Sequence, residues 1–289
     1  MLTMTNINKT YPDGTCALNN ITLNLPTGMV GLLGPNGAGK SSLMRTLACL
    51  QLPDSGTITF DGCNILNEPE ALRAQLGYLP QYFGVYPNMS CRALLVHIAI
   101  LKGLKKADYL QQIERLLALT HLTDVADKKV VNFSGGMRQR FGIAQALLGD
   151  PQLIIMDEPT AGLDPMERES LNNLLVDISK HRLVLLSTHI VEDVENLCHH
   201  VAIINQGRVI ESGDVQTLLA PLHNKIWRSD VKPDGVSAAH ILSKSYRYGQ
   251  SAYRIYSDNQ PSPDAALVPA TLQDKYFFEL NKQGVLSCC

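Results

Sequence analysis

Residues 34–42, Gly-Pro-Asn-Gly-Ala-Gly-Lys-Ser-Ser, place a glycine-rich turn between an apolar run and a helical pattern. The apolar run before it, residues 29–33, is predicted to be a buried strand. After it, Leu43, Leu47 and Leu50 are spaced as on one face of a helix. Such a strand, turn and helix N-terminus form an anion site, because backbone N–H groups and the helix dipole both favour negative charge. The segment fits G-x-x-x-x-G-K-[ST], the phosphate-binding loop.

The loop also indicates which atoms would hold the phosphates. Gly34, Gly37 and Gly39 tolerate positive φ angles and let the backbone approach a ligand closely. Lys40 can reach the β- and γ-phosphates of a nucleotide, and the Ser41 hydroxyl can bind Mg²⁺. The alternative is a glycine-rich turn before an ordinary helix. It would require the loop pattern to arise by chance, which is expected in roughly one chain of this length in a hundred.

The composition is that of an ordinary globular protein. The 289 residues allow one large domain or two small ones, and 45% of them are hydrophobic. The net charge of −2 argues against a nucleic-acid-binding surface. The longest apolar helical run, residues 93–101, is far shorter than the roughly 20 residues that span a bilayer, and no signal peptide is recognisable. The chain is therefore expected to act on a membrane only from outside the bilayer.

The seven cysteines are scattered along the chain without a C-x-x-C pair. Their odd number and the lack of a secretory signal predict reduced thiols in a cytosol. Cys288 and Cys289 end the chain and could in principle carry a lipid, but no other feature supports such processing.

The order of patterns along the chain predicts an α/β fold. Residues 21–25 and 57–60 alternate apolar and polar side chains and are predicted to be antiparallel strands. Residues from about 87 to 135 show helical spacing, which indicates a helical insertion. The continuous apolar runs 153–156 and 183–186 are typical of parallel strands buried on both faces. We expect a mostly parallel sheet with an antiparallel β subdomain beside it.

The last part of the chain differs in character and is predicted to be a separate extension. We place the main domain at residues 1–220 and a small C-terminal α+β extension of unknown role at residues 221–289. Residues 245–248 and 252–256, which interleave Arg and Tyr, predict a hairpin joined through Gly249. Such a strand could stack on single-stranded nucleic acid, but ordinary strands are favoured because the chain has no basic surplus.

Two adjacent carboxylates follow the apolar run 153–156. Asp157 would end a buried strand at its carboxyl end, where ligands bind in open α/β sheets. There it could bind Mg²⁺, and Glu158 could act as general base on the attacking water. Two acids directly after four apolar residues are difficult to explain as a solvated face.

Five further segments are similar to motifs of one family. They are Lys-Thr-Tyr at residues 9–11, Tyr-Leu-Pro-Gln at 78–81, Phe-Ser-Gly-Gly-Met at 133–137, Ala-Gly-Leu-Asp at 161–164 and Ser-Thr-His at 187–189. With the phosphate loop and the paired carboxylates, and in this order, they resemble the ATP-binding subunits of ABC transporters from about residue 2 to residue 219. The resemblance implies a P-loop nucleotide-hydrolase core and an ATPase with ATP and Mg²⁺ as cofactors.

The resemblance also implies roles for particular residues. Gln81 would contact Mg²⁺ or the attacking water, His189 would contact the γ-phosphate, and Asp164 would lie at a dimer interface besides capping a helix. With Glu158 as base, the implied catalytic residues are Glu158, His189 and Gln81, and the implied Mg²⁺ ligands are Ser41, Gln81 and Asp157. The implied ATP contacts are Tyr11, Gly34, Pro35, Asn36, Gly37, Ala38, Gly39, Lys40, Ser41 and Ser42, and from the other protomer Ser134, Gly135, Gly136 and Met137.

The implied partners follow from the same family. Such a chain forms a homodimer or pairs with another ATPase subunit. It binds transmembrane subunits at the cytoplasmic face of the membrane, and no nucleic-acid partner is expected. Residues 269–278 resemble the closing segment of cassettes that serve exporters, which favours export over import. A soluble ATPase of the same superfamily acting on ribosomes or DNA remains the alternative, disfavoured because one cassette and no heptad run are present.

Two positions depart from the family pattern. Met137 stands where the family usually has Gln, and Ala161 stands where Ser is commoner. The first change removes a polar side chain near the partner's nucleotide, but the glycine amides beside it remain. We therefore expect hydrolysis to survive.

Overall fold

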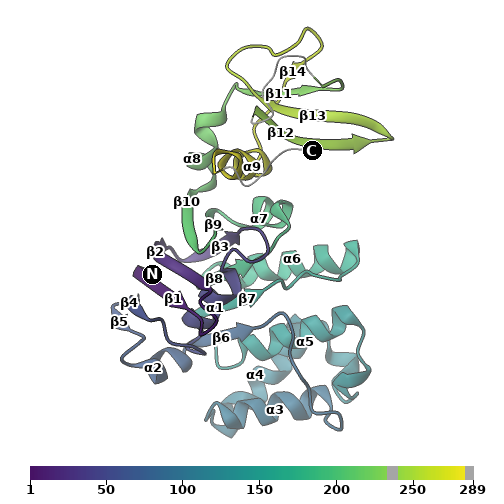
Figure 1. The fold of residues 1–289 in the computed structure, drawn as a ribbon. Helices are drawn as coiled ribbons and strands as arrows, with labels where there is room; N and C mark the ends of the chain where they lie inside the picture. Colours follow the sequence, from purple (N-terminus) through teal and green to yellow (C-terminus); the bar gives the residue numbers. More distant parts are fainter. Residues whose placement is uncertain (233–239, 284–289) are drawn as a thin grey trace.

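The computed structural model describes residues 1–232 and 240–283. Cys288 and Cys289 lie outside the described residues. Figure 1 shows a body of mixed strands and helices, with a smaller sheet and the helix α9 (Leu272–Lys282) at one end. The predicted fold class, an α/β core with a mostly parallel sheet, is confirmed.

A six-stranded sheet forms the centre of the body. Five neighbouring strands run parallel, and the sixth pairs antiparallel at one edge. In spatial order the strands are β10 (Arg208–Asp214), β9 (His200–Asn205), β3 (Gly28–Leu33), β8 (Leu183–Ser187), β7 (Leu153–Asp157) and β6 (Leu76–Leu79). The parallel strands β3, β7 and β8 are almost continuously apolar and buried, as expected where helices or a second sheet cover both faces.

The antiparallel subdomain packs on one face of the central sheet. Its strands, in the order β2, β1, β4, β5, span Cys16–Leu25, Leu2–Thr10, Ser55–Phe60 and Cys63–Asn64. The two predicted strands both belong to it, but each pairs with β1 rather than with the other. Their inward side chains share a core with β3 and with the helix α1 (Lys40–Leu47). The short helix α2 (Pro69–Arg73) leads from this subdomain to β6.

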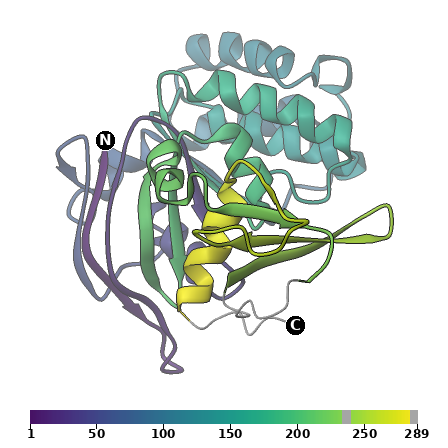
Figure 2. The ribbon, with the colours of Figure 1, turned by 90° about the horizontal axis from the view of Figure 1, so that it is seen from above.

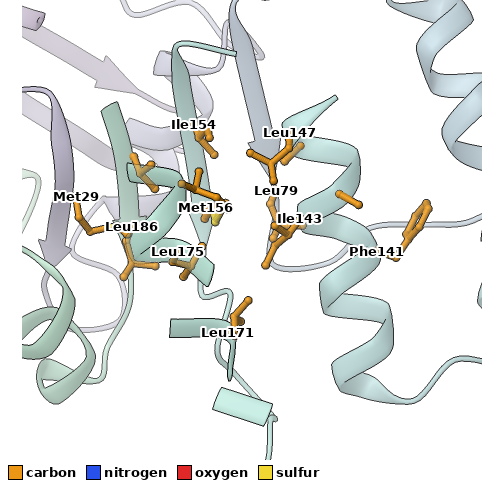
Figure 3. Close-up of a cluster of buried hydrophobic side chains, with 14 of the residues drawn as sticks. Met29, Leu79, Phe141, Ile143, Leu147, Ile154, Met156, Leu171, Leu175 and Leu186 are labelled. Atoms are coloured by element: carbon orange, nitrogen blue, oxygen red, sulfur yellow. The ribbon is translucent and has the colours of Figure 1, made fainter. Parts of the chain in front are cut away.

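Helices cover the other face of the sheet, and the helices of the predicted insertion pack on one of them rather than on the sheet itself. The insertion holds α3 (Cys91–Leu101), α4 (Lys106–Leu119) and two short 3₁₀ turns, η1 (Thr123–Val125) and η2 (Val130–Asn132), before α5 (Gly135–Leu147). Figure 3 shows Ile143 and Leu147 of α5 beside Leu79, with Met156 of the neighbouring strand close by. The helix α5 therefore packs on the strands that end at the predicted site, and the insertion contacts these strands through α5.

Two more helices follow the strands β7 and β8. They are α6 (Pro165–Ser179) and α7 (Val191–Leu197). Asp164 caps α6, because its Oδ1 accepts a hydrogen bond of 2.8 Å from the backbone N–H of Glu167. Pro165 occupies the first turn of this helix, where a backbone N–H would have no partner within the helix, so no hydrogen bond is lost.

The C-terminal part forms a second, smaller sheet. After α8 (Val215–Leu219) and the turn η3 (Ala220–Leu222) come four strands in the order β12, β13, β11, β14. They span Ile241–Arg247, Gln250–Tyr256, Ile226–Ser229 and Ala266–Leu267. The predicted hairpin is β12–β13, and its turn uses the positive φ angles of Tyr248 and Gly249.

The helix α9 returns from this sheet to the main body and lies between them (Figure 2). Its Leu272 is fully buried in the main core, and the Leu272 backbone N–H donates to Glu195 Oε1 of α7 at 3.1 Å. Thr271 and Asp274 form a capping box at its start. Asp274 also accepts two hydrogen bonds of 2.6 Å from Arg254 of β13, which holds the small sheet against the helix.

A buried ion-pair cluster fixes α9 to β10. Lys275 Nζ lies 2.6 Å from Glu211 Oε2 and 2.8 Å from Glu279 Oε1, and its side chain is only 3% exposed. Burial acts to lower the pKa of Lys275, but the two carboxylates outweigh it and leave that pKa raised. The contribution of Lys275 to stability is therefore fully present below the ordinary lysine pKa of about 10.4 and is lost as pH rises through its raised pKa, whereas that of Glu279, whose pKa is lowered, is lost as pH falls.

We expect Lys275→Met to lower the free energy of unfolding by about 3 kcal/mol, because it leaves the buried carboxylate of Glu279 with only the exposed Lys282 and removes the cation from Glu211. Urea unfolding at neutral pH measures the change. Lys282→Met is the matched control, since Lys282 contacts the same Glu279 oxygen at 3.3 Å but is 56% exposed. The control should cost less than about 1 kcal/mol. Equal losses of stability in the two variants would show that burial does not strengthen the contribution of Lys275.

Candidate nucleotide site

The site lies where four parallel strands end side by side. The phosphate loop follows β3, and the register pairs Leu32 of β3 and Asp157 of β7 with Ser187, the last residue of β8. The strand β6 ends next to β7 and leads to Gln81. Side chains that are far apart in the sequence therefore meet at one edge of the sheet, as open α/β sheets bind ligands.

The phosphate loop wraps around the N-terminus of α1. Gly37 and Gly39 have φ angles of 79° and 103°, which side-chain-bearing residues rarely adopt. A Cβ on Gly39 would also collide with the carbonyl oxygen of Ala17, and one on Gly34 would collide with that of Ile204. These glycines are therefore required by local geometry, and the loop presents backbone N–H groups at a helix start.

Lys40 begins α1 and is almost fully buried. Its Nζ donates hydrogen bonds to the carbonyl oxygens of Gly34 at 2.6 Å and Pro35 at 3.1 Å. Burial lowers the pKa of Lys40, while Glu158 and Asp157 act in the opposite direction. The ammonium thus lies within the loop, between its carbonyls and the two carboxylates at the end of β7.

Glu158 is held between two of the other predicted residues. Its Oε2 accepts a hydrogen bond of 2.8 Å from Gln81 Nε2, and its Oε1 lies 2.9 Å from His189 Nδ1. Because a carboxylate only accepts hydrogen bonds, this contact places a proton on Nδ1 of His189. Glu158 has a positive φ of 52°, and its backbone N–H donates to the Ser187 carbonyl. Such strain at a side-chain-bearing residue is typical of functional sites.

A cavity of about 490 Å³ is lined by the phosphate loop, Gln81 and Glu158, but not by His189, which contacts Glu158 from outside it. It collects most of the predicted same-chain residues, together with Thr15, Cys16 and Ala17, which the sequence reasoning missed. Its lining is Tyr11, Thr15, Cys16, Ala17, Asn36, Gly37, Ala38, Gly39, Lys40, Ser41, Ser42, Gln81, Asp157 and Glu158. Thr15 ends the turn that follows Tyr11, and Cys16 and Ala17 begin β2, so the nearness of Tyr11 in the sequence was the available signal.

Tyr11 lies at the wall of this cavity with its ring orientation fixed. The Tyr11 hydroxyl is 3.0 Å from Ser42 Oγ and 3.1 Å from Gln51 Oε1. These contacts tie the aromatic ring to the first turn of α1. A planar ring held beside a phosphate loop can stack on the base of a nucleotide.

The donor set suits Mg²⁺. Ser41, Gln81 and Asp157 line the same cavity, and a hydroxyl, an amide oxygen and a carboxylate are the hard oxygen ligands that Mg²⁺ prefers. Gln81 donates to Glu158 through its nitrogen, which leaves its amide oxygen available for a cation. The residues present therefore fit the ion.

The motif at residues 133–137 forms a separate cradle. Ser134 caps α5, since its Oγ accepts from the Met137 backbone N–H at 3.2 Å, and Ser134 and Gly135 are exposed. Gly136 is buried against the carboxylate of Glu167, which a Cβ would overlap. No residue of this motif is among the described residues that line the 490 Å³ cavity. Asp164 is also exposed, besides capping α6.

Comparison with known proteins places the chain in a family. A family model described as ABC transporter matches residues 18–161. The Nod factor export ATP-binding protein I of Cupriavidus metallidurans is 39% identical over 224 residues, which cover 76% of this chain and 73% of that protein. The methionine import ATP-binding protein MetN of Chromohalobacter salexigens is 38% identical, over 74% of this chain and 65% of that protein. The chain belongs to the ATP-binding proteins of ABC transporters.

A solved structure supports the activity of this class. A dimeric ATP-binding cassette in a post-hydrolysis state with ADP and Pi has a TM-score of 0.67 and 26% identity, over 74% of this chain and 98% of that one. The chain is an ABC ATPase that binds ATP, and cassettes of this class form dimers and act with transmembrane subunits. Across residues 1–232 and 240–283, none of the helices has the length and apolar character needed to cross a membrane.

Proposed function

We propose that this chain hydrolyses ATP as one half of a dimer and thereby drives export by transmembrane subunits. The observation that carries the catalytic part is the position of Glu158 between Gln81 and His189, at the edge of the phosphate-loop cavity. Three polar groups that converge in this way can orient a water molecule and stabilise the charge that develops on the γ-phosphate.

In the proposed reaction, Glu158 takes a proton from water as the water oxygen attacks the γ-phosphorus. The bond between the γ-phosphorus and the bridging oxygen breaks, which leaves ADP and inorganic phosphate. Lys40 and His189 contact the γ-phosphate, and Ser41, Gln81 and Asp157 would hold Mg²⁺, which neutralises phosphate charge when bound. Tyr11 stacks on adenine.

The dimer part of the proposal follows from the separate cradle. Ser134 to Met137 open a helix whose N-terminal amides can bind an anion, but they do not line the cavity of their own chain. In the proposed dimer they contact the γ-phosphate bound by the other protomer, and Asp164 lies at the interface. The dimer then closes when ATP binds and reopens after phosphate is released, and this movement drives the transmembrane subunits.

The membrane partner is proposed to dock beside Gln81. Tyr82 and Tyr86 are 85% and 57% exposed, although large aromatic side chains are costly to leave in water. Phe83, between them, packs against Phe141 of α5, and the ring of Tyr86 meets His97 of α3, which ties this surface to the insertion. We propose that the transmembrane subunits bind here, and that residues 1–220 form the ATPase domain on the cytoplasmic face, with residues 221–289 as an extension.

Export is favoured by the Nod factor export relative and by residues 269–278, whose Thr271 and Asp274 begin α9. Because a methionine import protein is almost equally similar, direction needs its own test. Identification of the membrane protein that co-purifies from detergent-solubilised membranes, followed by ATP-driven transport in inside-out vesicles, provides it. Uptake into such vesicles supports export. Recovery with ribosomes instead of a membrane protein would overturn the transport proposal.

We expect Tyr82→Ala combined with Tyr86→Ala to reduce recovery of the membrane subunit at least tenfold in this co-purification, because aromatic anchors dominate interface energies. ATP affinity of the isolated chain should be unchanged. Tyr246→Ala is the matched control, since Tyr246 is 67% exposed but lies on β12 of the extension. Full recovery of the membrane subunit with the double variant would place the docking surface elsewhere.

A further inference from the structure

A buried carboxylate outside the catalytic set lies at the junction of three functional segments. Asp193 of α7 is only 1% exposed, and no step of the proposed reaction uses it. Its Oδ2 accepts a hydrogen bond of 2.8 Å from Thr160 Oγ1. Its Oδ1 accepts from Arg168 Nε at 2.7 Å and lies 2.5 Å from Arg168 Nη2. Both oxygens of this buried charge are therefore engaged by donors from other segments.

The partners of Asp193 come from the segments that carry the proposed catalytic and interface residues. Thr160 lies two residues after Glu158, and Arg168 lies four residues after Asp164 in α6. Asp193 itself lies four residues after His189. One carboxylate thus connects the loop after β7, the start of α6 and the start of α7.

The loop between Glu158 and Thr160 is short and tightly turned. The Ala161 backbone N–H donates to the Glu158 carbonyl, and the Leu163 N–H donates to that of Thr160. On the other side, Val194 of α7 packs so closely on Gly31 of β3 that a Cβ there would collide with it. The Thr160 hydroxyl therefore meets, through Asp193, a helix that is packed closely against the central sheet.

We propose that Asp193 is a positioning residue that sets the contact between Glu158 and His189. Charge-assisted hydrogen bonds away from solvent are strong and directional. This carboxylate can therefore hold the loop that carries Glu158 at a fixed position relative to the start of α7, which follows His189. The inference rests on the proposed role of Glu158 as base. It predicts an effect on turnover rather than on ATP binding, because none of Thr160, Arg168 and Asp193 lines the nucleotide cavity.

The sharpest test uses a pair of substitutions at Thr160. Thr160→Val removes the hydroxyl donor while keeping the shape, and Thr160→Ser keeps the donor. We expect Thr160→Val to lower kcat for ATP about tenfold with less than a twofold change in KM, since small displacements of reacting groups are costly. Thr160→Ser should restore most of the kcat. Equal kcat values for Val, Ser and wild type would overturn the proposal.

Asp193→Asn tests the carboxylate itself. The amide can still donate to the Thr160 hydroxyl and accept from Arg168 through its oxygen, but it lacks the negative charge that pairs with the Arg168 guanidinium. We expect a tenfold or larger fall in kcat. Glu192→Gln, an equal charge change at the exposed neighbouring residue, should leave kcat unchanged. A similar loss in both variants would indicate a general charge effect and contradict the assignment.

A double-mutant cycle separates positioning from plain destabilisation. If Asp193 acts through the Glu158–His189 contact, Asp193→Asn should change residual turnover less than twofold in a His189→Ala background. A merely structural role would give the same fold-loss in both backgrounds and would overturn the inference. Failure of the base assignment is distinguishable, because Glu158→Gln would then stay active regardless of any variant at Asp193 or Thr160.

Discussion

Glu158→Gln should bind ATP as the wild type does and lose turnover by roughly 10²–10⁴-fold, the contribution typical of a positioned general base. The substituted amide keeps the size of the side chain and one oxygen that can accept from Gln81. It has no basic lone pair with which to take the proton of water. Single-turnover hydrolysis of ATP, with binding measured separately by a fluorescent analogue, checks both parts of the expectation.

The same variant should accumulate as a closed dimer in ATP, since binding drives closure and hydrolysis reopens it. Size-exclusion chromatography with ATP and Mg²⁺ should show the dimer for Glu158→Gln and mostly monomer for the wild type. Glu192→Gln serves as the control, because Glu192 is exposed on α7 and has the same charge change. Turnover at the wild-type rate would show that another group accepts the proton, and a monomer in ATP would contradict the trapped dimer.

Much of the fold and of the site arrangement follows from local patterns. A buried apolar run of four or five residues fixes a strand, and in a parallel sheet all such strands end at one edge. Asp157, Ser187 and the residues after Leu79 therefore had to lie near the phosphate loop. The contact of Gln81 with Glu158, 77 positions apart in the sequence, was predictable in outline for this reason.

Local patterns could not predict which strand pairs with which, or which helices pack together. The strands 21–25 and 57–60 were recognisable, but alternation does not say that β1 lies between them. Likewise, a capping box is visible at Thr271, but nothing local indicates that the Leu272 N–H meets Glu195 of α7. Asp193 looked like an ordinary acidic residue at a helix start, because its burial arises only when α6 and α7 pack together.

Lys40→Ala should weaken ATP binding by about 100-fold or more. Hydrogen bonds to charged groups each contribute about 1.5–3 kcal/mol, and the lysine would contact two phosphates. The measurement is the shift of the thermal midpoint by ATP and Mg²⁺. Ligand binding stabilises the folded state by RT ln(1 + [L]/Kd), so the wild type should gain about 2.7 kcal/mol at 100 times Kd. The variant at the same ATP concentration should gain less than about 0.5 kcal/mol.

The ligand-free fold should tolerate this substitution. Burial already lowers the pKa of Lys40, which means that the folded chain holds this charge at a cost, and its Nζ donates to the carbonyls of Gly34 and Pro35. The thermal midpoint without nucleotide should therefore be unchanged or higher. Lys180→Ala, which removes a lysine exposed on the surface and paired with Asp177, should keep the full ATP shift. Wild-type ATP affinity in Lys40→Ala would mean that residues 34–42 do not grip the nucleotide phosphates, and the hydrolysis site built around Glu158 would lose its substrate.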